Sequence, residues 1–332
     1  MNMFVNIPIE PIPMRYSVDW DEWITSFFIE KIDFITIKGV ELTSGIEQGR
    51  FLDCIGTNYY KSSQLQKLLT HIFAGSIPKN SILFFHDLWF PGIEQIKYTS
   101  DLLDLNLKIT GCLHAGAYDP NDYLYQKGLG NWAVHFENML FQLVDRIFVA
   151  TNYHKNLILK NRACDSFKIH VTGFPFKAPP KIECIKKDQI VFPHRFDSEK
   201  NYELFKDFIQ NTTLPNGWSF ITTFDNAKNK EDYYRILWES KIALSFADQE
   251  TWGIAMQEAT CCDNLVLVPN KLAYKEMYTD VFKYKNIFDL QAKLFDFCNN
   301  FYDDQLQNEL EIQKEVILFN GKNALKNMWF GI

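Results

Sequence analysis

Glycine, long apolar runs and paired cysteines are scarce in this sequence, and each shortage excludes a class of protein or site. Glycine accounts for 15 of the 332 residues, below the typical share of about 7%, so we expect no glycine-rich phosphate loop. No apolar run approaches the roughly 18 residues of a spanning helix, which excludes a membrane-spanning protein. The seven cysteines are odd in number and include no Cys-x-x-Cys pair, so we expect neither a disulfide scaffold nor a bound metal.

Positive charge is also in deficit. The chain has 34 Lys and Arg residues against 41 Asp and Glu residues, for a net charge of −7, which argues against a protein that coats nucleic acid nonspecifically. The N-terminus, MNMFVNIPIEP, has neither the basic segment nor the apolar core of a signal peptide. Together with the cysteine usage, this predicts a reducing, cytoplasmic location.

What the sequence does have is an alternation of short apolar runs with segments of helical spacing. The runs predict strands at 4–7, 34–37, 51–54, 82–85, 108–113, 147–150 and 169–171, and then at 190–192, 219–222, 242–245 and 265–268. Helices are predicted at 62–69 with a serine N-cap, 131–143, 152–160, 202–210, 232–240 and 252–261, with further helices to the C-terminus. This order is typical of an α/β protein with parallel sheets between helices.

Three prolines between residues 173 and 181 interrupt the alternation. Neither a helix nor a central strand continues through such a segment, and the length suggests two domains of roughly 150 residues each. We predict two Rossmann-like domains, at 1–176 and at 177–315. Residues 316–332 are predicted to form a C-terminal helix that packs back on the first domain.

Two glutamates with seven residues between them, Glu250 and Glu258, form the strongest motif. Glu250 lies where the strand 242–245 is followed by a helix, and Glu258 lies about two turns along that helix. Amides at a helix start hold anions, and neighbouring carboxylates suit sugar and ribose hydroxyls. The alternative is that Glu250 only caps the helix and Glu258 is solvated.

A second motif, in residues 192–201, places Arg195 and Lys200 directly after a strand. A planar guanidinium binds phosphate oxygens in bidentate fashion and a lysine adds a mobile point charge. The pair is therefore suited to a diphosphate, although the same spacing also occurs at solvated helix starts.

The two motifs together resemble those of retaining glycosyltransferases with the GT-B fold, of the family 4 type. The resemblance implies a GT-B α/β fold, in which two Rossmann-like domains with parallel sheets face an interdomain cleft. It assigns acceptor binding to the domain at 1–176 and nucleotide-sugar binding to the domain at 177–315. It also implies a metal-independent hexosyl or pentosyl transfer that needs no cofactor, with a nucleoside-diphosphate sugar as co-substrate and a UDP-sugar favoured over a GDP-sugar. By the same resemblance the donor-binding residues are Arg195, Lys200, Glu250, Thr251, Trp252, Gly253 and Glu258, of which Arg195, Lys200 and Glu250 are also catalytic.

The resemblance implies an active-site histidine in the N-terminal half, where a strand ends. His114 follows the strand 108–113, and His86 with Asp87 follows the strand 82–85. We predict His114 as a catalytic residue, while the choice between His86 and His114 as the active-site histidine stays open. His86, Asp87, His114 and Tyr118 are the predicted acceptor-binding residues, with the alternative that they are structural. The loop 7–13 departs from the family, because prolines stand where its members commonly have glycines.

Segments of the N-terminal half, including 56–60 and 85–92, also resemble glycosyltransferases encoded by large double-stranded DNA phages. This resemblance implies a hydroxylated or hydroxymethylated cytosine in phage DNA as the acceptor, modified in the host cytoplasm. Residues 155–187 hold eight basic residues against two acidic ones, a basic strip that can follow a phosphate backbone or merely be a solvated linker.

Two other interpretations stay open. The acceptor can be a saccharide, a lipid or a modified tRNA base, because residues 193–201 also resemble the tRNA-queuosine mannosyltransferases. In the second interpretation, the protein is of another class: a non-catalytic GT-B relative that only binds nucleotide or nucleic acid. The sequence is compatible with a monomer or a dimer.

Overall fold

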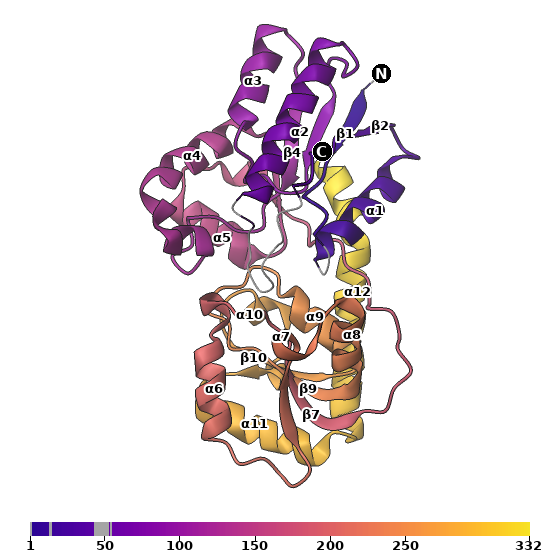
Figure 1. The fold of residues 1–332 in the computed structure, drawn as a ribbon, viewed down its shortest axis with the longest axis vertical. Helices are drawn as coiled ribbons and strands as arrows, with labels where there is room; N and C mark the ends of the chain where they lie inside the picture. Colours follow the sequence, from indigo (N-terminus) through magenta and orange to yellow (C-terminus); the bar gives the residue numbers. More distant parts are fainter. Residues whose placement is uncertain (1, 13–14, 43–52, 54) are drawn as a thin grey trace. The chain divides into compact units, whose positions relative to one another are not determined.

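The computed structural model describes residues 2–12, 15–42, 53 and 55–332, and the chain divides into two compact units. The N-terminal unit comprises Met1–Pro175 and Asn323–Ile332, and the C-terminal unit comprises Phe176–Lys322. The proline-containing segment 173–181 has neither helix nor strand, as its sequence predicts. Each unit is an α/β structure around a parallel sheet (Figure 1), which confirms the predicted fold class.

The described part of the N-terminal unit contains a six-stranded parallel sheet in the order β2-β1-β3-β4-β5-β6. Its strands are β1 (Met3–Ile7), β2 (Asp33–Thr36), β3 (Ile82–Phe85), β4 (Lys108–Cys112), β5 (Arg146–Val149) and β6 (Ile169–Val171). Each coincides with a predicted strand to within one residue at each end. The further strand predicted at 51–54 lies, apart from Asp53, outside the described residues.

The helices of this unit are α1 (Tyr16–Phe28), α2 (Gly56–Phe73), α3 (Ile93–Leu102), α4 (Gly130–Leu143) and α5 (Asn152–Asn161), with short turns η1 (Tyr125–Leu129) and η2 (Ser166–Lys168). The predicted serine N-cap is wrong, because Ser62 lies inside α2, more than a turn after its start at Gly56. Helix α1 was not predicted as a separate element. It lies beside the last turns of α12 (Asp304–Gly331) (Figure 1), where the rings of Phe28 and Trp329 meet edge to face at 5.7 Å.

The C-terminal unit contains, in its described residues, a five-stranded parallel sheet in the order β11-β10-β9-β7-β8. Its strands are β7 (Lys187–Phe192), β8 (Ser219–Thr222), β9 (Ser240–Leu244), β10 (Leu265–Pro269) and β11 (Lys283–Tyr284). The helices are α6 (Tyr202–Gln210), α7 (Thr223–Asn226), α8 (Lys230–Glu239), α9 (Ile254–Cys261), α10 (Tyr274–Met277), α11 (Ile287–Asn300) and most of α12, with turns η3 (Ser198–Lys200) and η4 (Asp280–Phe282). The segment after β10 was predicted to be helical to the C-terminus. It is mostly helical, with the two-residue strand β11 between η4 and α11.

The large phenylalanine content is explained by the two cores. In the N-terminal unit, Phe4 stacks on Phe28 with ring centroids 4.2 Å apart, and Phe84 lies 5.4 Å from Phe4. In the C-terminal unit, Phe192 stacks on Phe205 at 4.5 Å. These side chains are buried, and each buried aromatic side chain removes about 150–250 Å² of surface from water. Aromatic rings packed between sheet and helices therefore hold each unit together.

Candidate functional site

The two motifs of the C-terminal unit meet at one edge of its sheet. Strand β7 lies between β8 and β9, so the chain leaves β7 toward one side and later returns to β9 on the other. The carboxyl ends of β7 and β9 form the topological switch point, where ligands bind in open α/β sheets. The backbone carbonyl of Glu199, after β7, accepts hydrogen bonds from the amides of Asp248 (2.9 Å) and Gln249 (3.3 Å), after β9.

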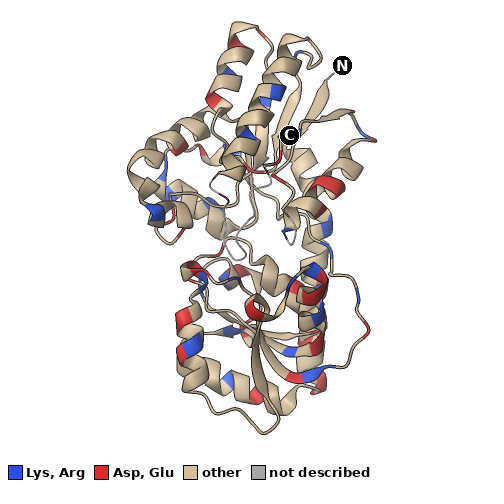
Figure 2. Ribbon diagram, viewed as in Figure 1, with Lys and Arg blue, Asp and Glu red and all other residues tan. Residues whose placement is uncertain are grey.

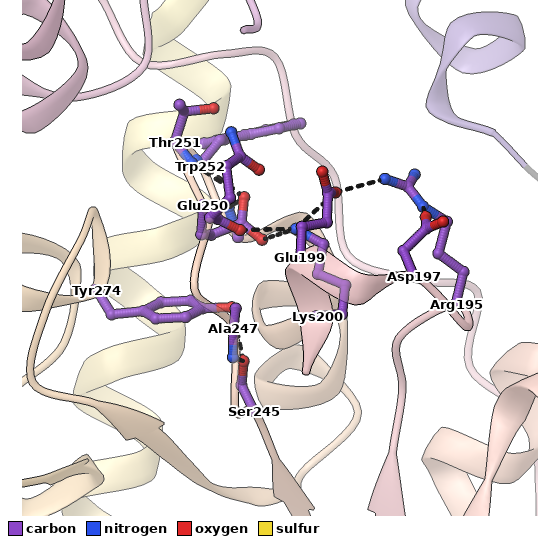
Figure 3. Close-up of polar contacts among 12 residues, drawn as sticks. Arg195, Asp197, Glu199, Lys200, Ser245, Ala247, Glu250, Thr251, Trp252 and Tyr274 are labelled. Carbon is purple, nitrogen blue, oxygen red and sulfur yellow. Dashed lines mark hydrogen bonds and ion pairs between the residues drawn. The ribbon is translucent and has the colours of Figure 1, made fainter. Parts of the chain in front are cut away.

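Lys200, from the motif 192–201, contacts Glu250 of the other motif (Figure 3). Its Nζ donates to the carbonyl of Gln249 at 2.9 Å and lies 3.3 Å from Glu250 Oε2 and 3.5 Å from Glu199 Oε1. The side chain is 10% exposed, so these ion pairs are shielded from bulk water and are stronger than surface pairs. The structure thus brings Lys200 to Glu250 across 50 residues of sequence.

Arg195 lies at the outer side of the same cluster. Its Nη2 donates to Glu199 Oε1 at 2.8 Å and its Nε donates to the carboxylate of Asp197. Burial alone would lower the pKa of Arg195, but the neighbouring Glu199 and Asp197 carboxylates raise it above the usual value. The guanidinium is therefore a fixed cation that is held by two carboxylates (Figure 3).

Glu250 binds the amides of the turn that leads into α9 (Ile254–Cys261). Its Oε1 accepts hydrogen bonds from Thr251 (3.2 Å), Trp252 (3.2 Å) and Gly253 (2.7 Å). Burial would raise its pKa, but Lys200 and these amides lower the pKa below the ordinary value. Glu250 is thus an ionised carboxylate that holds the turn before α9 and pairs with Lys200, and its contact with a donor sugar stays a prediction.

Gly253 is needed for this turn. Its φ of +69° is in the left-handed region, and a Cβ atom here would lie 2.6 Å from Tyr274 Cε1. A side chain at this position would therefore strain the backbone and push into a buried ring. The neighbouring Thr251 and Trp252 are each 7% exposed.

Glu258 is half-buried and hydrogen-bonded, rather than simply solvated as one alternative from sequence had it. Its Oε2 accepts from the hydroxyl of Tyr233 at 2.9 Å and its Oε1 from the hydroxyl of Tyr234 at 3.1 Å. The two tyrosine bonds fix the orientation of the carboxylate. Binding of a ribose by Glu258 stays a prediction.

In the N-terminal unit, His114 lies just after β4, as predicted. Its Nε2 is 2.7 Å from the carbonyl of His86, which can only accept, so Nε2 carries the proton. Its Nδ1 is then an acceptor and lies 3.2 Å from the hydroxyl of Tyr16. Burial lowers the pKa of His114 despite the nearby Asp87, so the ring is neutral and can accept a hydrogen bond from a hydroxyl.

His86 and Tyr118 are poorly placed for the predicted contact with an acceptor. His86 is 0% exposed, its Nε2 is bonded to Asn6 at 2.6 Å, and burial lowers its pKa to about 3. Tyr118 is 2% exposed and its hydroxyl is bonded to His154 at 2.6 Å. Both side chains point into packed regions, so His114 is the better candidate for the active-site histidine.

Asp87 is held by Lys61 of α2 and by an amide of its own loop. Its Oδ2 pairs with Lys61 at 3.0 Å and its Oδ1 accepts from the amide of Trp89 at 3.1 Å. The side chain is still 22% exposed. Contact with an acceptor therefore stays a prediction for this residue.

Sequence reasoning missed three carboxylates that the structure places in the polar networks. Asp197 and Glu199 lie within the motif 192–201. Their positions between Arg195 and Lys200 could have indicated ion pairs with these two cations. Glu137, in α4, is 0% exposed and accepts from Trp89 Nε1 (2.9 Å), the amide of Ala117 (2.6 Å) and Arg162 (2.7 Å). No local signal identified it, because its partners come from three other segments.

Part of the predicted basic strip is engaged in contacts within the protein. Lys155, Lys168 and Lys186 donate to backbone carbonyls, and Arg162 pairs with the buried Glu137. The strip is also divided between the two units at Pro175. Figure 2 shows basic and acidic segments interspersed over both units, rather than a continuous basic track.

Across the described part of the chain, no three His, Cys, Asp or Glu side chains come together as metal ligands. Among residues 2–12, 15–42, 53 and 55–332, none of the helices combines the length and apolar character that crossing a bilayer requires.

No protein-family model matches the chain. A curated relative, the tRNA-queuosine alpha-mannosyltransferase of Drosophila melanogaster, is 27% identical over an alignment of 168 residues. That alignment covers 40% of this chain and 45% of the fly protein, so the match spans less than half of the relative.

The fold is similar to those of solved glycosyltransferases. Sucrose-phosphate synthase from Thermosynechococcus elongatus superposes with a TM-score of 0.69 at 11% identity, over 99% of this chain and 98% of that one. The catalytic domain of starch synthase IV from Arabidopsis thaliana, bound to ADP and acarbose, gives 0.65 at 10% identity over 99% and 98%. At these identities the similarity concerns the fold alone, and that fold is GT-B, as the sequence motifs predicted.

Proposed function

We propose that the protein is a retaining, metal-independent glycosyltransferase that moves a sugar from a nucleoside-diphosphate sugar to a hydroxyl group of a modified nucleoside in tRNA. The observation that carries the proposal is the convergence of Arg195, Lys200 and Glu250 at the switch point of the C-terminal sheet. Cations and helix-start amides at such a point are suited to a diphosphate. The GT-B fold and the relative that mannosylates queuosine support the same reaction class.

In the proposed reaction, the bond between the sugar C1 and the phosphate oxygen breaks, and a bond between C1 and the acceptor oxygen forms. Arg195 and Lys200 stabilise the negative charge that develops on the leaving nucleoside diphosphate. The proton of the acceptor hydroxyl passes to the departing phosphate, so the acceptor enters from the face that the phosphate leaves and the configuration is retained.

The other residues orient the substrates. We assign the donor to the C-terminal unit, where Glu250 orients hydroxyls of the donor sugar and Glu258 binds the ribose. We assign the acceptor to the N-terminal unit, where His114 Nδ1 accepts a hydrogen bond from a substrate hydroxyl in place of Tyr16.

A modified tRNA nucleoside is favoured over a phage DNA cytosine as the acceptor. The Drosophila relative acts on tRNA, by its name, and the alignment covers 45% of that protein. The basic strip, which was the structural argument for a DNA backbone, is partly engaged in internal hydrogen bonds.

The test is a transfer assay with unmodified and queuosine-containing tRNA, using GDP-mannose, UDP-glucose and UDP-N-acetylglucosamine as donors and mass spectrometry of the digested nucleosides. We expect one donor to add its sugar to a tRNA nucleoside, and the variant Arg195→Ala to lose transfer while it still folds, as its circular dichroism would show. Full activity of Arg195→Ala would refute the site. Transfer to hydroxymethylcytosine DNA, a saccharide or a lipid would refute the acceptor, and binding of a donor without transfer to any acceptor would refute catalysis.

A further inference from the structure

The cations of the candidate diphosphate site are already neutralised by the protein itself. Arg195 contacts Asp197 and Glu199, and Lys200 contacts Glu199 and Glu250. Two cations against three carboxylates leave the cluster with a net charge of −1. A diphosphate brought into this arrangement would meet carboxylates at the positions its oxygens need, and like charges in a shielded site repel strongly.

The side chains of this cluster of two cations and three carboxylates differ in how exposed they are. The side chains of Glu199, Lys200 and Glu250 are 9%, 10% and 14% exposed, whereas Asp197 and Arg195 are 20% and 31% exposed. Arg195 is thus the group that can turn toward a ligand with the least rearrangement. Glu199 is held through its main chain, whose carbonyl accepts from Asp248 and Gln249, so its carboxylate can rotate while its backbone stays in place.

We propose that Asp197 and Glu199 occupy the diphosphate positions on Arg195, so that the donor binds by exchange with these carboxylates and they set its affinity. This inference rests on the proposed function, since it concerns the same donor site. Neither residue contacts the reacting atoms. They compete with the substrate, and removing one of them without changing its size strengthens nucleotide binding.

The experiment is isothermal titration calorimetry of the full chain with UDP, GDP and inorganic pyrophosphate, in buffer without divalent cations. Glu199→Gln removes the carboxylate that touches both cations, and Asp197→Asn removes the other partner of Arg195. The matched control is Glu203→Gln in α6, which removes the same charge from a side chain that is 72% exposed and pairs only at the surface with Lys206.

We expect Glu199→Gln and Asp197→Asn each to tighten the binding of pyrophosphate and of the preferred nucleotide by about tenfold. This is the effect of losing one charge-assisted hydrogen bond that competes with the ligand. The control should stay within about twofold, since exposed pairs are weak. The corresponding nucleoside, which lacks phosphates, should bind all three variants equally. In an Arg195→Ala background the gain from Asp197→Asn should disappear, because Arg195 is the cation that Asp197 pairs with, whereas the gain from Glu199→Gln should only shrink, because Glu199 also pairs with Lys200.

The outcomes separate the two proposals. Nucleotide binding by the wild-type chain that is unchanged or weakened in Glu199→Gln and Asp197→Asn would overturn the exchange and leave the proposed function standing. If none of the three probes binds the folded wild type or the folded variants, the donor site itself is wrong and both proposals fall. Thermal unfolding of each variant checks the fold, and Asp197→Asn carries the test if Glu199→Gln does not fold.

Discussion

Replacing Glu137 tests whether a buried ion pair stabilises the N-terminal unit near His114. The carboxylate is 0% exposed and accepts from Trp89, Ala117 and Arg162, and the side chain of Arg162 is 9% exposed. Glu137→Ala leaves a buried guanidinium without its partner, a change that destabilises proteins by about 3–5 kcal/mol. Glu137→Gln keeps the volume and one oxygen acceptor, so we expect a smaller loss of about 2 kcal/mol.

The assay is urea unfolding of the full chain, followed by circular dichroism and tryptophan fluorescence. With a urea dependence of about 2 kcal/mol per molar, a loss of about 4 kcal/mol moves the midpoint by about 2 M. We expect this shift only in the transition of the N-terminal unit, because all of these contacts lie there.

The control is Asp101→Asn, which breaks the exposed pair between Lys97 and Asp101 in the same unit. Such a pair contributes about 0.3–0.5 kcal/mol. If Glu137→Ala shifted the midpoint no more than this control, the reasoning from buried charge would be refuted.

Three further predictions concern other contacts. Tyr234→Phe removes one of the two hydrogen bonds that orient Glu258, so nucleotide affinity should fall by about tenfold, and unchanged affinity in calorimetry would contradict a positioning role. Gly253→Ala introduces a Cβ atom 2.6 Å from Tyr274 Cε1 at a positive φ, so it should destabilise the C-terminal unit by about 2 kcal/mol or more in urea unfolding. Burial lowers the pKa of His154 to about 3, so the unfolded chain binds a proton below pH 6.5 that the folded chain does not. Stability should therefore fall as the pH drops from about 6.5 toward 3, by about 1.4 kcal/mol per pH unit for this residue, and His154→Gln should reduce that slope.

Two controls match these variants. Gly217→Ala also has a positive φ, of +91°, but its Cβ would have only Asp188 Oδ2 nearby, at 3.9 Å. A difference between it and Gly253→Ala isolates the contact with Tyr274. Tyr98→Phe removes a hydroxyl from a side chain that is 65% exposed, and nucleotide affinity should not respond to it. A pH slope that His154→Gln leaves unchanged would show that other groups set the pH dependence.

The fold was largely predictable because its signals are local. Strands buried on both faces appear as short apolar runs, and the helices between them have apolar residues at helical spacing. The first residues of helices were less predictable, as at Ser62. The sequence alone does not distinguish a serine that caps a helix from a serine inside it. Helix α1 was missed because its identity depends on packing against β1 and α12 through Phe28.

The sequence by itself determined the order of strands and helices, the break at the prolines, and the positions of Arg195, Lys200 and Glu250 directly after strands. These features follow from residue type and spacing along the chain. Only the tertiary structure decided the partners of each charge: that Glu199 bridges both cations, that two tyrosines hold Glu258, and that His86 is buried. The physical reason is that hydrogen bonds and burial join side chains from distant segments, and the energy of a charge depends on those neighbours more than on its own identity.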